Sequence, residues 1–380
     1  MEITGVSDLP LHYGRVPNWL IPIMRRLSRA IMDVMLLEWG PGKVVERLSN
    51  PLWFQGFNNV IGMDWDSSGS TTVTLGILKE VTRPQDDGLA ILGGKGRNSL
   101  NVPLELRKLP GRFDVDVEKL ERTSRLVAKV DSTLLQDGYE LYHHSLILDE
   151  KGRWGVIQQG MNLETKFARR YHWISVANPV DELREGIAGA YNGVVLNVHE
   201  SHEAKEVIID LLGEDPRRIS RQYLQLMSYI RGNSIESWLG LGTLGAISRE
   251  ARMIYMKPVD VNKVMKILNH VREFSPTNLQ DALLLGLGPS TVRALSLISD
   301  LIYSEPPSYR DPVNYPYDPF KYAFAIGGKD GVPYPVRRDV AFEVIQTLED
   351  IVSQTKLDKK DKSLALNKLR ELKLGTSKRS

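Results

Sequence analysis

Acidic side chains and histidines gather between residues 131 and 166, in a stretch that could hold a catalytic metal ion. Asp131, Asp137 and Asp149 supply carboxylate oxygens, and His144 supplies an imidazole close to them in the sequence. Carboxylate oxygens are the ligands that Mg²⁺ and Mn²⁺ prefer in proteins. A bound cation can also activate the water that attacks a phosphodiester. We therefore expect Asp131, Asp137 and Asp149 to bind Mg²⁺ or Mn²⁺, with His144 as a further catalytic residue.

Glu164 and Lys166 extend this pattern into an acid followed by Glu-x-Lys. Many metal-dependent nucleases use that order, in which two carboxylates hold the cation and the lysine supports the attacking water. Because 25% of the residues are charged, the same triplet also arises by chance. Glu164 and Lys166 are therefore either catalytic residues of a nuclease or ordinary surface residues.

The adjacent histidines His143 and His144 lie on an expected strand. Neighbouring side chains on a strand face opposite sides of the sheet, so the two rings do not bind one metal ion together. In the functional interpretation one ring joins Asp131 or Asp137 at a site. In the alternative, the hairpin is only structural, with one histidine in the core and the other at the surface.

A second candidate site is the turn within LLLGLGPSTVRALSLISDLIY, residues 283–303. Gly286 and Gly288 flank one apolar residue, and Ser290 and Thr291 follow, which is the helix-hairpin-helix pattern. Glycine permits a sharp turn and a close approach to a ligand. The free N–H groups at the start of the second helix favour an anion such as a nucleic-acid phosphate. The alternative is a glycine that ends one helix before an ordinary second helix.

Basic residues also lie in two glycine-rich loops. Lys95 and Arg97 belong to GGKGRNS, and Lys329, Arg337 and Arg338 lie in or after GGKDG. In such loops the backbone can approach a phosphate closely, so we expect these five residues to contribute to nucleic-acid binding. The alternative is that they only keep the loops soluble.

Hydrophobic periodicity indicates which elements carry these residues. A helix is expected from Val115 to about Asp131, followed by strands Tyr139–Leu148 and Trp154–Gln159 around a glycine-containing turn. Residues 216–310 are expected to be helical throughout and contain the glycine turn. Further helices are expected at three places: 21–38, ended by Gly40-Pro41-Gly42, then 71–81 and 340–353.

These elements predict a mixed α/β, helix-rich fold. An N-terminal mixed domain with a β-hairpin region precedes a helical C-terminal half that contains a helix-hairpin-helix. The expected divisions are an N-terminal mixed domain (1–112), a central αβ domain with the hairpin (113–215), a helical helix-hairpin-helix domain (216–355) and a basic tail (356–380).

Composition excludes several classes of protein. The chain of 380 residues has no cysteine, which excludes disulfides, thiolate catalysis and cysteine-based metal sites and also fits a thermophilic source. No apolar run approaches the ~18 residues of a membrane span, and the start MEITGVSDLP lacks the order of a secretory signal. We therefore expect a cytoplasmic protein without a membrane partner. A net charge of +2 does not by itself predict nucleic-acid binding.

Five blocks of sequence resemble an archaeal and bacterial family, the domain of unknown function 763. The blocks are TGVSDLPLHYGRVPNWL, FQGFNNVIGMDWDSSGSTT, QDGYELYHHSLILDEKGRWGVIQQGMN, ARRYHW and IGGKDGVPYPV. The resemblance extends over most of residues 1–345. It implies a cytosolic prokaryotic protein whose helical part resembles helix-hairpin-helix DNA-binding modules, and it implies no activity.

The segment GLGPSTVRALSLISDLIYSEPPSYRD also resembles the helix-hairpin-helix DNA glycosylases. That resemblance implies a catalytic aspartate a short distance after the hairpin, where Asp311 stands. Ser290 occupies the position of the lysine that the bifunctional members use, and the sequence Arg310-Asp-Pro-Val differs from the family pattern.

Three functions are consistent with these patterns, and all of them involve nucleic acid. The first is a metal-dependent nuclease that acts on structured or damaged DNA in DNA processing or repair. The second is a glycosylase-like base-excision enzyme centred on Asp311. The third is a non-catalytic DNA-binding protein, or an RNA-binding one, because a phosphate contact does not distinguish the two sugars. No oligomeric state is predicted.

Overall fold

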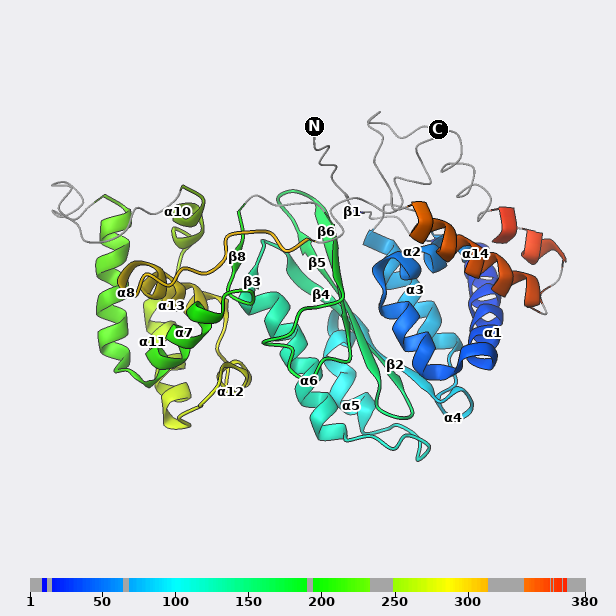
Figure 1. Ribbon diagram of the computed structural model, residues 1–380, viewed down its shortest axis with the longest axis horizontal. Helices are drawn as coiled ribbons and strands as arrows, with labels where there is room; N and C mark the ends of the chain where they lie inside the picture. Colours follow the sequence, from blue (N-terminus) through cyan, green and yellow to red (C-terminus); the bar gives the residue numbers. More distant parts are fainter. Residues whose placement is uncertain are drawn as a thin grey trace.

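A six-stranded antiparallel sheet forms the centre of the computed structural model, and helices cover both of its faces (Figure 1). The structure describes residues 9–11, 16–63, 68–189, 194–232, 249–313, 338–355, 357, 359–363 and 365–367 of the 380. The strands are β1 (Leu9–Pro10), β2 (Leu89–Lys95), β4 (Glu140–Asp149), β5 (Trp154–Asn162), β6 (Phe167–Ile174) and β7 (Gly186–Gly189). Their order across the sheet is β1, β6, β5, β4, β2, with β7 also paired to β6.

The expected β-hairpin is confirmed, because β4 and β5 pair antiparallel around the turn that follows Asp149. Its two neighbours in the sheet, β2 and β6, were not expected to be strands. The sequence of β6, FARRYHWI, places two adjacent arginines in the sheet interior, and β2 ends in two glycines before Lys95. Both strands are covered on both faces and so lack the apolar–polar alternation of a half-exposed strand.

Helices from both ends of the chain cover one face of the sheet (Figure 1). They are α1 (Leu20–Ser49), α2 (Pro51–Val60), α3 (Ser68–Val81) and α14 (Arg338–Gln354). Their buried apolar side chains, such as Met24 and Phe57, form one core with Ile147 and Ile157 of the sheet. This core accounts for most of the apolar burial on that side.

Helix α1 continues past Gly40-Pro41-Gly42, where the sequence predicted an end. Gly40 adopts φ 73° and ψ 169°, which interrupts the helical path, and Pro41 lies at the start of the helical segment that follows. Proline is favoured in a first turn because its missing N–H would have no partner there. The glycine and proline therefore change the direction of the chain without preventing a second helical segment.

The other face of the sheet carries α5 (Val102–Leu106) and α6 (Val117–Lys129). Helix α6 passes directly into η2 (Val130–Leu134), a single π-helical turn of a kind that is rare and often found at functional sites. Next comes β3 (Leu135–Gln136), which pairs with β8 (Leu196–Asn197) in a separate two-stranded sheet. The segment that follows α6 thus leads out of the central sheet toward the helical half.

The expectation of a helical C-terminal half is confirmed. Its helices, which lie beyond α6 and the small sheet in Figure 1, are α7 (His202–Gly213), α8 (Pro216–Ile230), α10 (Arg249–Tyr255), α11 (Val261–Glu273), α12 (Leu279–Leu284) and α13 (Pro289–Ile302). Helix α13 is buried along most of its length and forms the centre of this half.

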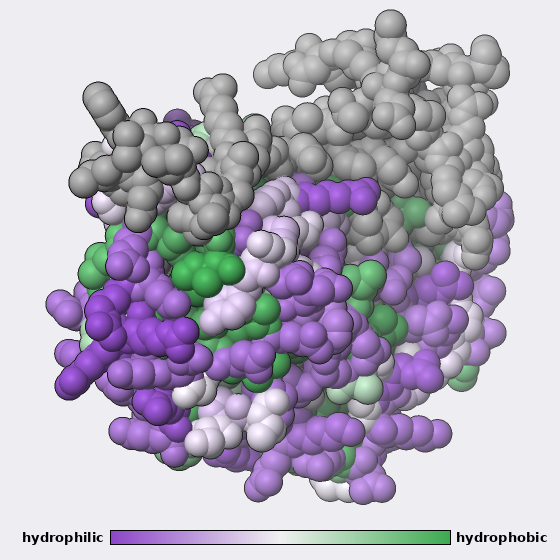
Figure 2. All heavy atoms as spheres, turned by 60° about the vertical axis from the view of Figure 1, so that its left-hand side comes forward, coloured by the Kyte–Doolittle hydropathy of each residue, from purple (hydrophilic) through white to green (hydrophobic). Residues whose placement is uncertain are grey.

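The surface of the helical half is mainly hydrophilic. Figure 2 brings this side of the molecule forward and shows apolar residues only in patches among polar ones. Leu224, Met253 and Phe274 are among the exposed large apolar side chains. In the part of the chain that the structure describes, no helix is both long enough and apolar enough to span a membrane.

Several contacts cross the expected domain divisions. Strand β2, from the expected first domain, pairs along its whole length with β4 of the second. Helix α14, assigned to the helical half, packs on α1 and α2 instead. Ala365 and Leu366, assigned to the basic tail, also pack against the core beneath α1. The ends of the chain therefore complete the N-terminal layer.

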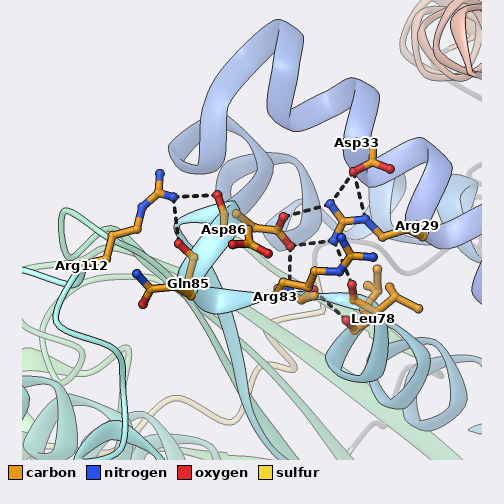
Figure 3. Close-up of polar contacts among 10 residues, drawn as sticks. Arg29, Asp33, Leu78, Arg83, Gln85, Asp86 and Arg112 are labelled. Atoms are coloured by element: carbon orange, nitrogen blue, oxygen red, sulfur yellow. Dashed lines mark hydrogen bonds and ion pairs between the residues drawn. The ribbon is translucent and has the colours of Figure 1, made fainter.

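A cluster of ion pairs joins α1 to the short helix α4 (Pro84–Asp87) that precedes β2 (Figure 3). The guanidinium of Arg29 donates to both oxygens of Asp87, at 2.7 and 2.9 Å, and also to Asp33. The backbone N–H of Arg83 donates to Asp87 at 2.7 Å. Burial alone would raise the pKa of Asp87, but the hydrogen bonds from Arg29 and Arg83 outweigh it and lower the pKa.

We predict that Asp87→Asn destabilises the protein by about 3 kcal/mol at pH 7, because it leaves Arg29 without its buried counter-charge. The lowered pKa means that this stabilisation is present above the ordinary aspartate pKa of about 3.9 and is lost as the pH falls below it. Urea denaturation of the variant should therefore show a weaker loss of stability below pH 4 than the wild type shows. Asp33→Asn is the matched control, since Asp33 contacts the same guanidinium but is exposed. An equal loss in both variants would contradict the prediction.

Candidate functional site

Polar residues form a row across the centre of the sheet on each of its faces. On the face toward α6, His144 of β4 lies opposite Gln158 of β5, which lies opposite Tyr171 of β6. The other face carries the equivalent row, with the cross-strand neighbours His143, Gln159 and Arg170. All six side chains are buried, so each needs a hydrogen-bond partner inside the protein.

Asp131, in the π-helical turn η2, is fully buried above the row that faces α6. Its Oδ2 accepts hydrogen bonds from Gln158 Nε2 at 2.6 Å and from Trp173 Nε1 at 2.7 Å. Its Oδ1 accepts from Arg184 Nε at 3.0 Å. Burial raises the pKa of Asp131, and the charge of Arg184 opposes that rise. The carboxylate is thus held by one cation and two neutral donors.

Asp137 and Asp311 share a second buried guanidinium, that of Arg169. Nη1 of Arg169 donates to Asp137 at 2.7 Å, and Nη2 donates to Asp311 at 2.7 Å. Tyr171 donates its hydroxyl to Asp137 at 2.7 Å, and burial raises the pKa of this tyrosine well above its ordinary value. Arg169 therefore connects the central sheet to the end of the helical half.

His144 extends the Asp131 network toward α6. Its Nε2 lies 2.7 Å from the hydroxyl of Ser124, and its Nδ1 lies 2.7 Å from Oε1 of Gln158. Burial lowers the pKa of His144, so the ring is neutral at pH 7. The order serine, histidine, amide and carboxylate is similar to an activated nucleophile. Ser124 is only 5% exposed, however, which leaves a substrate no access to its hydroxyl.

The remaining predicted catalytic residues lie at the two ends of the hairpin. Asp149 is in the turn between β4 and β5, where its Oδ1 accepts hydrogen bonds from the N–H groups of Lys151 and Arg153. Glu164 and Lys166 are exposed in the turn that joins the opposite end of β5 to β6. The structure thus brings Asp131, Asp137 and His144 into one network but leaves Asp149, Glu164 and Lys166 outside it.

The carboxylates of the network do not fit a Mg²⁺ or Mn²⁺ site. Those of Asp131 and Asp137 already accept hydrogen bonds from buried arginines and neutral donors. The guanidinium groups thus supply the positive charge that a metal ion would supply. Among the described residues, no group of three or more histidine, aspartate or glutamate side chains is arranged to hold a metal ion.

The glycine turn lies between α12 and α13, as its sequence predicted. Gly286 adopts φ 110°, a conformation that favours glycine, and Leu287 is fully buried between the helices. Gly288 precedes α13 and provides no side chain to cap it. The N–H groups of Ser290 and Thr291 have no hydrogen-bond partner among the described residues. The Thr291 side chain is buried, so only its backbone N–H is available to a ligand.

One segment, residues 129–137, links this turn to the buried carboxylates. Lys129 Nζ donates to the carbonyl of Leu287 at 3.3 Å, and Gln136 Nε2 donates to the carbonyl of Pro289 at 2.9 Å. Asp131 and Asp137 belong to the same segment and point to the opposite side, toward the arginines. The turn and the network therefore share one backbone element.

The predicted basic loops are only partly described. Lys95 ends β2 and is exposed, with its Nζ 5.9 Å from the ring centroid of Tyr142. Arg97 is exposed in η1 (Gly96–Asn101). Lys329 and Arg337 lie outside the described residues, and Arg338 begins α14. None of the described contacts connects Lys95 or Arg97 to the α12–α13 turn.

Sequence reasoning missed the arginines that hold the network together. Neither Arg169 nor Arg184 was among the residues expected to form a site. The sole signal was their surroundings, because Arg169 lies within the apolar and aromatic sequence FARRYHWI of β6. An arginine in such a segment indicates a buried, paired guanidinium.

The amino-acid sequence matches one family model. Its description is Protein of unknown function (DUF763), and it matches residues 5–336, which include every strand of the central sheet and the α12–α13 turn. No curated protein and no solved structure matches the chain. The family description contains no activity, so a functional argument depends on the geometry.

We predict that Arg169→Met destabilises the protein by about 3–5 kcal/mol, because it leaves Asp137 and Asp311 as buried carboxylates without their shared cation. Adding Asp311→Asn to this variant should recover part of the loss. Urea denaturation at pH 7 measures both effects. Arg107→Met, at an exposed arginine, should change the free energy of unfolding by less than about 0.5 kcal/mol. If Arg169→Met is as stable as the wild type, the network does not hold the sheet and the helical half together.

Proposed function

We propose that this chain, which belongs to the family described as Protein of unknown function (DUF763), binds nucleic acid through the turn between α12 and α13. DNA is the partner that we propose, and the cellular role is DNA processing or repair. The observation that carries the proposal is the uncapped start of α13 at Gly288, where two backbone N–H groups have no partner among the described residues. Such a helix start is suited to a phosphate.

The space around Gly288 supports a close approach of a ligand. Its backbone is extended, with φ −124° and ψ 173°. A Cβ at this position would lie 3.9 Å from the carbonyl oxygen of Gly286. Glycine is thus not required here by the fold itself, and the absence of a side chain instead leaves the start of α13 open to a phosphate oxygen.

Basic residues on α6 extend this surface. Arg122, Arg125 and Lys129 recur at helical spacing, so they share one side of α6. Arg122 forms an ion pair with Asp281 of α12, and Lys129 contacts the turn itself. A stripe of cations beside a helix start provides several phosphate contacts along one strand.

The proposal is binding rather than cleavage. In a nuclease of the expected kind, carboxylates converge on a cation and leave room for the attacking water. Here Asp131 and Asp137 are engaged by arginines, while Asp149 and Glu164 lie at opposite ends of β5. A glycosylase role for Asp311 is not favoured either, because Arg169 donates to both of its carboxylate oxygens.

We predict that Gly288→Val weakens DNA binding by about ten- to a hundredfold. The branched side chain would occupy the approach to the start of α13, and loss of a charge-assisted contact costs roughly 1.5–3 kcal/mol. The loss should be the same for unrelated DNA sequences, because a phosphate contact carries no base information. Fluorescence anisotropy with labelled duplexes measures it.

Gly111→Val is the matched control, since Gly111 also has open space around an added Cβ and is exposed, whereas Gly288 is partly buried. Thermal unfolding of both variants checks that the fold is retained. We expect Gly288→Val to fold, because there is room for a side chain at Gly288. If folded Gly288→Val binds DNA as tightly as Gly111→Val does, the turn is only a connection between two helices.

A further prediction concerns the salt dependence of binding. Arg125→Gln should reduce the slope of log K against log salt on duplex DNA by about 0.9, the contribution of one neutralised phosphate. Titrations at several salt concentrations measure the slope. Arg25→Gln is the control, because Arg25 is a similarly exposed arginine on α1, across the sheet. If the slope for Arg125→Gln equals that of the wild type, α6 is not part of the interface.

A further inference from the structure

Arg293 of α13 is a buried cation without a carboxylate. It is 8% exposed and forms no ion pair with any described residue, whereas the buried Arg169 and Arg184 are both paired with aspartates. Burial lowers the pKa of Arg293, and no described carboxylate opposes this change. An arginine nevertheless stays protonated at neutral pH. A charge is therefore buried here without its counter-ion, which is costly unless an anion balances it.

The donors of this guanidinium are only partly used. Nη1 of Arg293 donates to Oε1 of Gln136 at 2.7 Å, and Nη2 donates to the carbonyl of Pro258 at 3.2 Å. Both partners are neutral. Nε is buried and has no hydrogen-bond partner. The N–H groups that are not engaged remain available to a ligand with several acceptor oxygens.

The side chain of Arg293 extends toward the α12–α13 turn. Pro289 and Arg293 are four residues apart, so they lie on one face of α13, and a long helical side chain points back toward the start of its helix. Gln136 accepts a hydrogen bond from Arg293 and donates one to the carbonyl of Pro289 at 2.9 Å. A single side chain thus separates the guanidinium from the first turn of α13. Pro258 and Pro289 are exposed, so this end of α13 is accessible from solvent.

Lys129 supplies a second cation at the same turn. Its Nζ lies 3.3 Å from the carbonyl of Leu287, and it forms no ion pair within the described part of the chain. Burial lowers the pKa of Lys129 as well. The carboxylate of Asp281, in α12, is paired with Arg122 instead. Two cations without a counter-charge therefore lie beside the partially positive start of α13.

We propose that a phosphate group is the counter-ion of Arg293, bound at the start of α13 with Arg293 and Lys129 as its cations. This inference rests on the phosphate site of the proposed function and identifies the two side chains that supply its charge. The backbone N–H groups at the start of α13 position the phosphate, and the guanidinium donates to its oxygens through the N–H groups that are not engaged. Because the phosphate balances a buried charge, its binding also stabilises the fold.

Thermal unfolding in inorganic phosphate tests the site without DNA. Phosphate should raise the melting temperature of the wild type saturably, beyond the effect of sodium chloride at the same ionic strength. Phosphate also stabilises proteins in general through its exclusion from their surface, so the saturable part of the rise is the measure. It should be lost in Arg293→Gln and reduced in Lys129→Gln. Arg218→Gln, at an exposed arginine of α8, is the matched control and should keep the rise.

Arg293→Lys keeps the charge but not the planar fork of donors, so it should retain part of the rise. Lys129 makes a single contact of 3.3 Å, so Lys129→Gln should fold and decides the question if Arg293→Gln does not. The absence of a saturable rise in the wild type, or an undiminished rise in these glutamine variants, would overturn the proposal.

DNA binding separates this proposal from the proposed function. Fluorescence anisotropy should show that folded Arg293→Gln binds duplex DNA about tenfold more weakly or worse. If Gly288→Val weakens DNA binding but Arg293→Gln does not, the turn binds DNA and Arg293 is not part of the site. If phosphate stabilises the protein through Arg293 but DNA does not bind, the anion site is confirmed and the proposed function is wrong.

Discussion

The buried ion pairs of Arg169 are the interaction on which the arrangement of this molecule depends. One guanidinium binds Asp137, which follows η2, and Asp311, which follows the last helix of the helical half. The charges are buried, so each would be costly without the others. The same ion pairs therefore fix the relative positions of the sheet, the segment after α6 and the end of the helical half. Loss of these ion pairs would release all three.

Residues 129–137 connect these buried ion pairs to the α12–α13 turn at the surface. The π-helical turn separates residues that serve the two sides, since Asp131 within it contacts the core while Lys129 before it and Gln136 after it contact the α12–α13 turn. A rigid core thus supports the proposed phosphate site, which gives that site a fixed geometry without requiring flexible loops.

Much of the fold could be predicted from local sequence patterns, but the pairing of the buried charges could not. The hairpin, the helical half and the glycine turn each show a short-range signal, and Asp149 caps its own turn through neighbours two and four residues away. Arg169, in contrast, meets partners 32 and 142 residues away. Strand β6 was missed because charged residues ordinarily lie at the surface. Asp149 lies in the β4–β5 turn, apart from the contacts of Asp131 and Asp137, because proximity in the sequence does not bring the two ends of a strand together.

The rows of polar residues on the two faces of the sheet have a consequence for folding. In β4 and β5 they are built from identical neighbours, His143-His144 and Gln158-Gln159, whereas β6 contributes Arg170 to one row and Tyr171 to the other. A slip of one residue in strand pairing normally moves apolar side chains to the wrong face. At the histidines and glutamines a slip would exchange each side chain for its twin, so these two pairs do not distinguish correct from shifted pairing of β4 with β5. The correct register is therefore specified by the aliphatic ends of the strands and by the irregularity between Leu141 and His143. At these positions a shifted pairing would misplace apolar side chains.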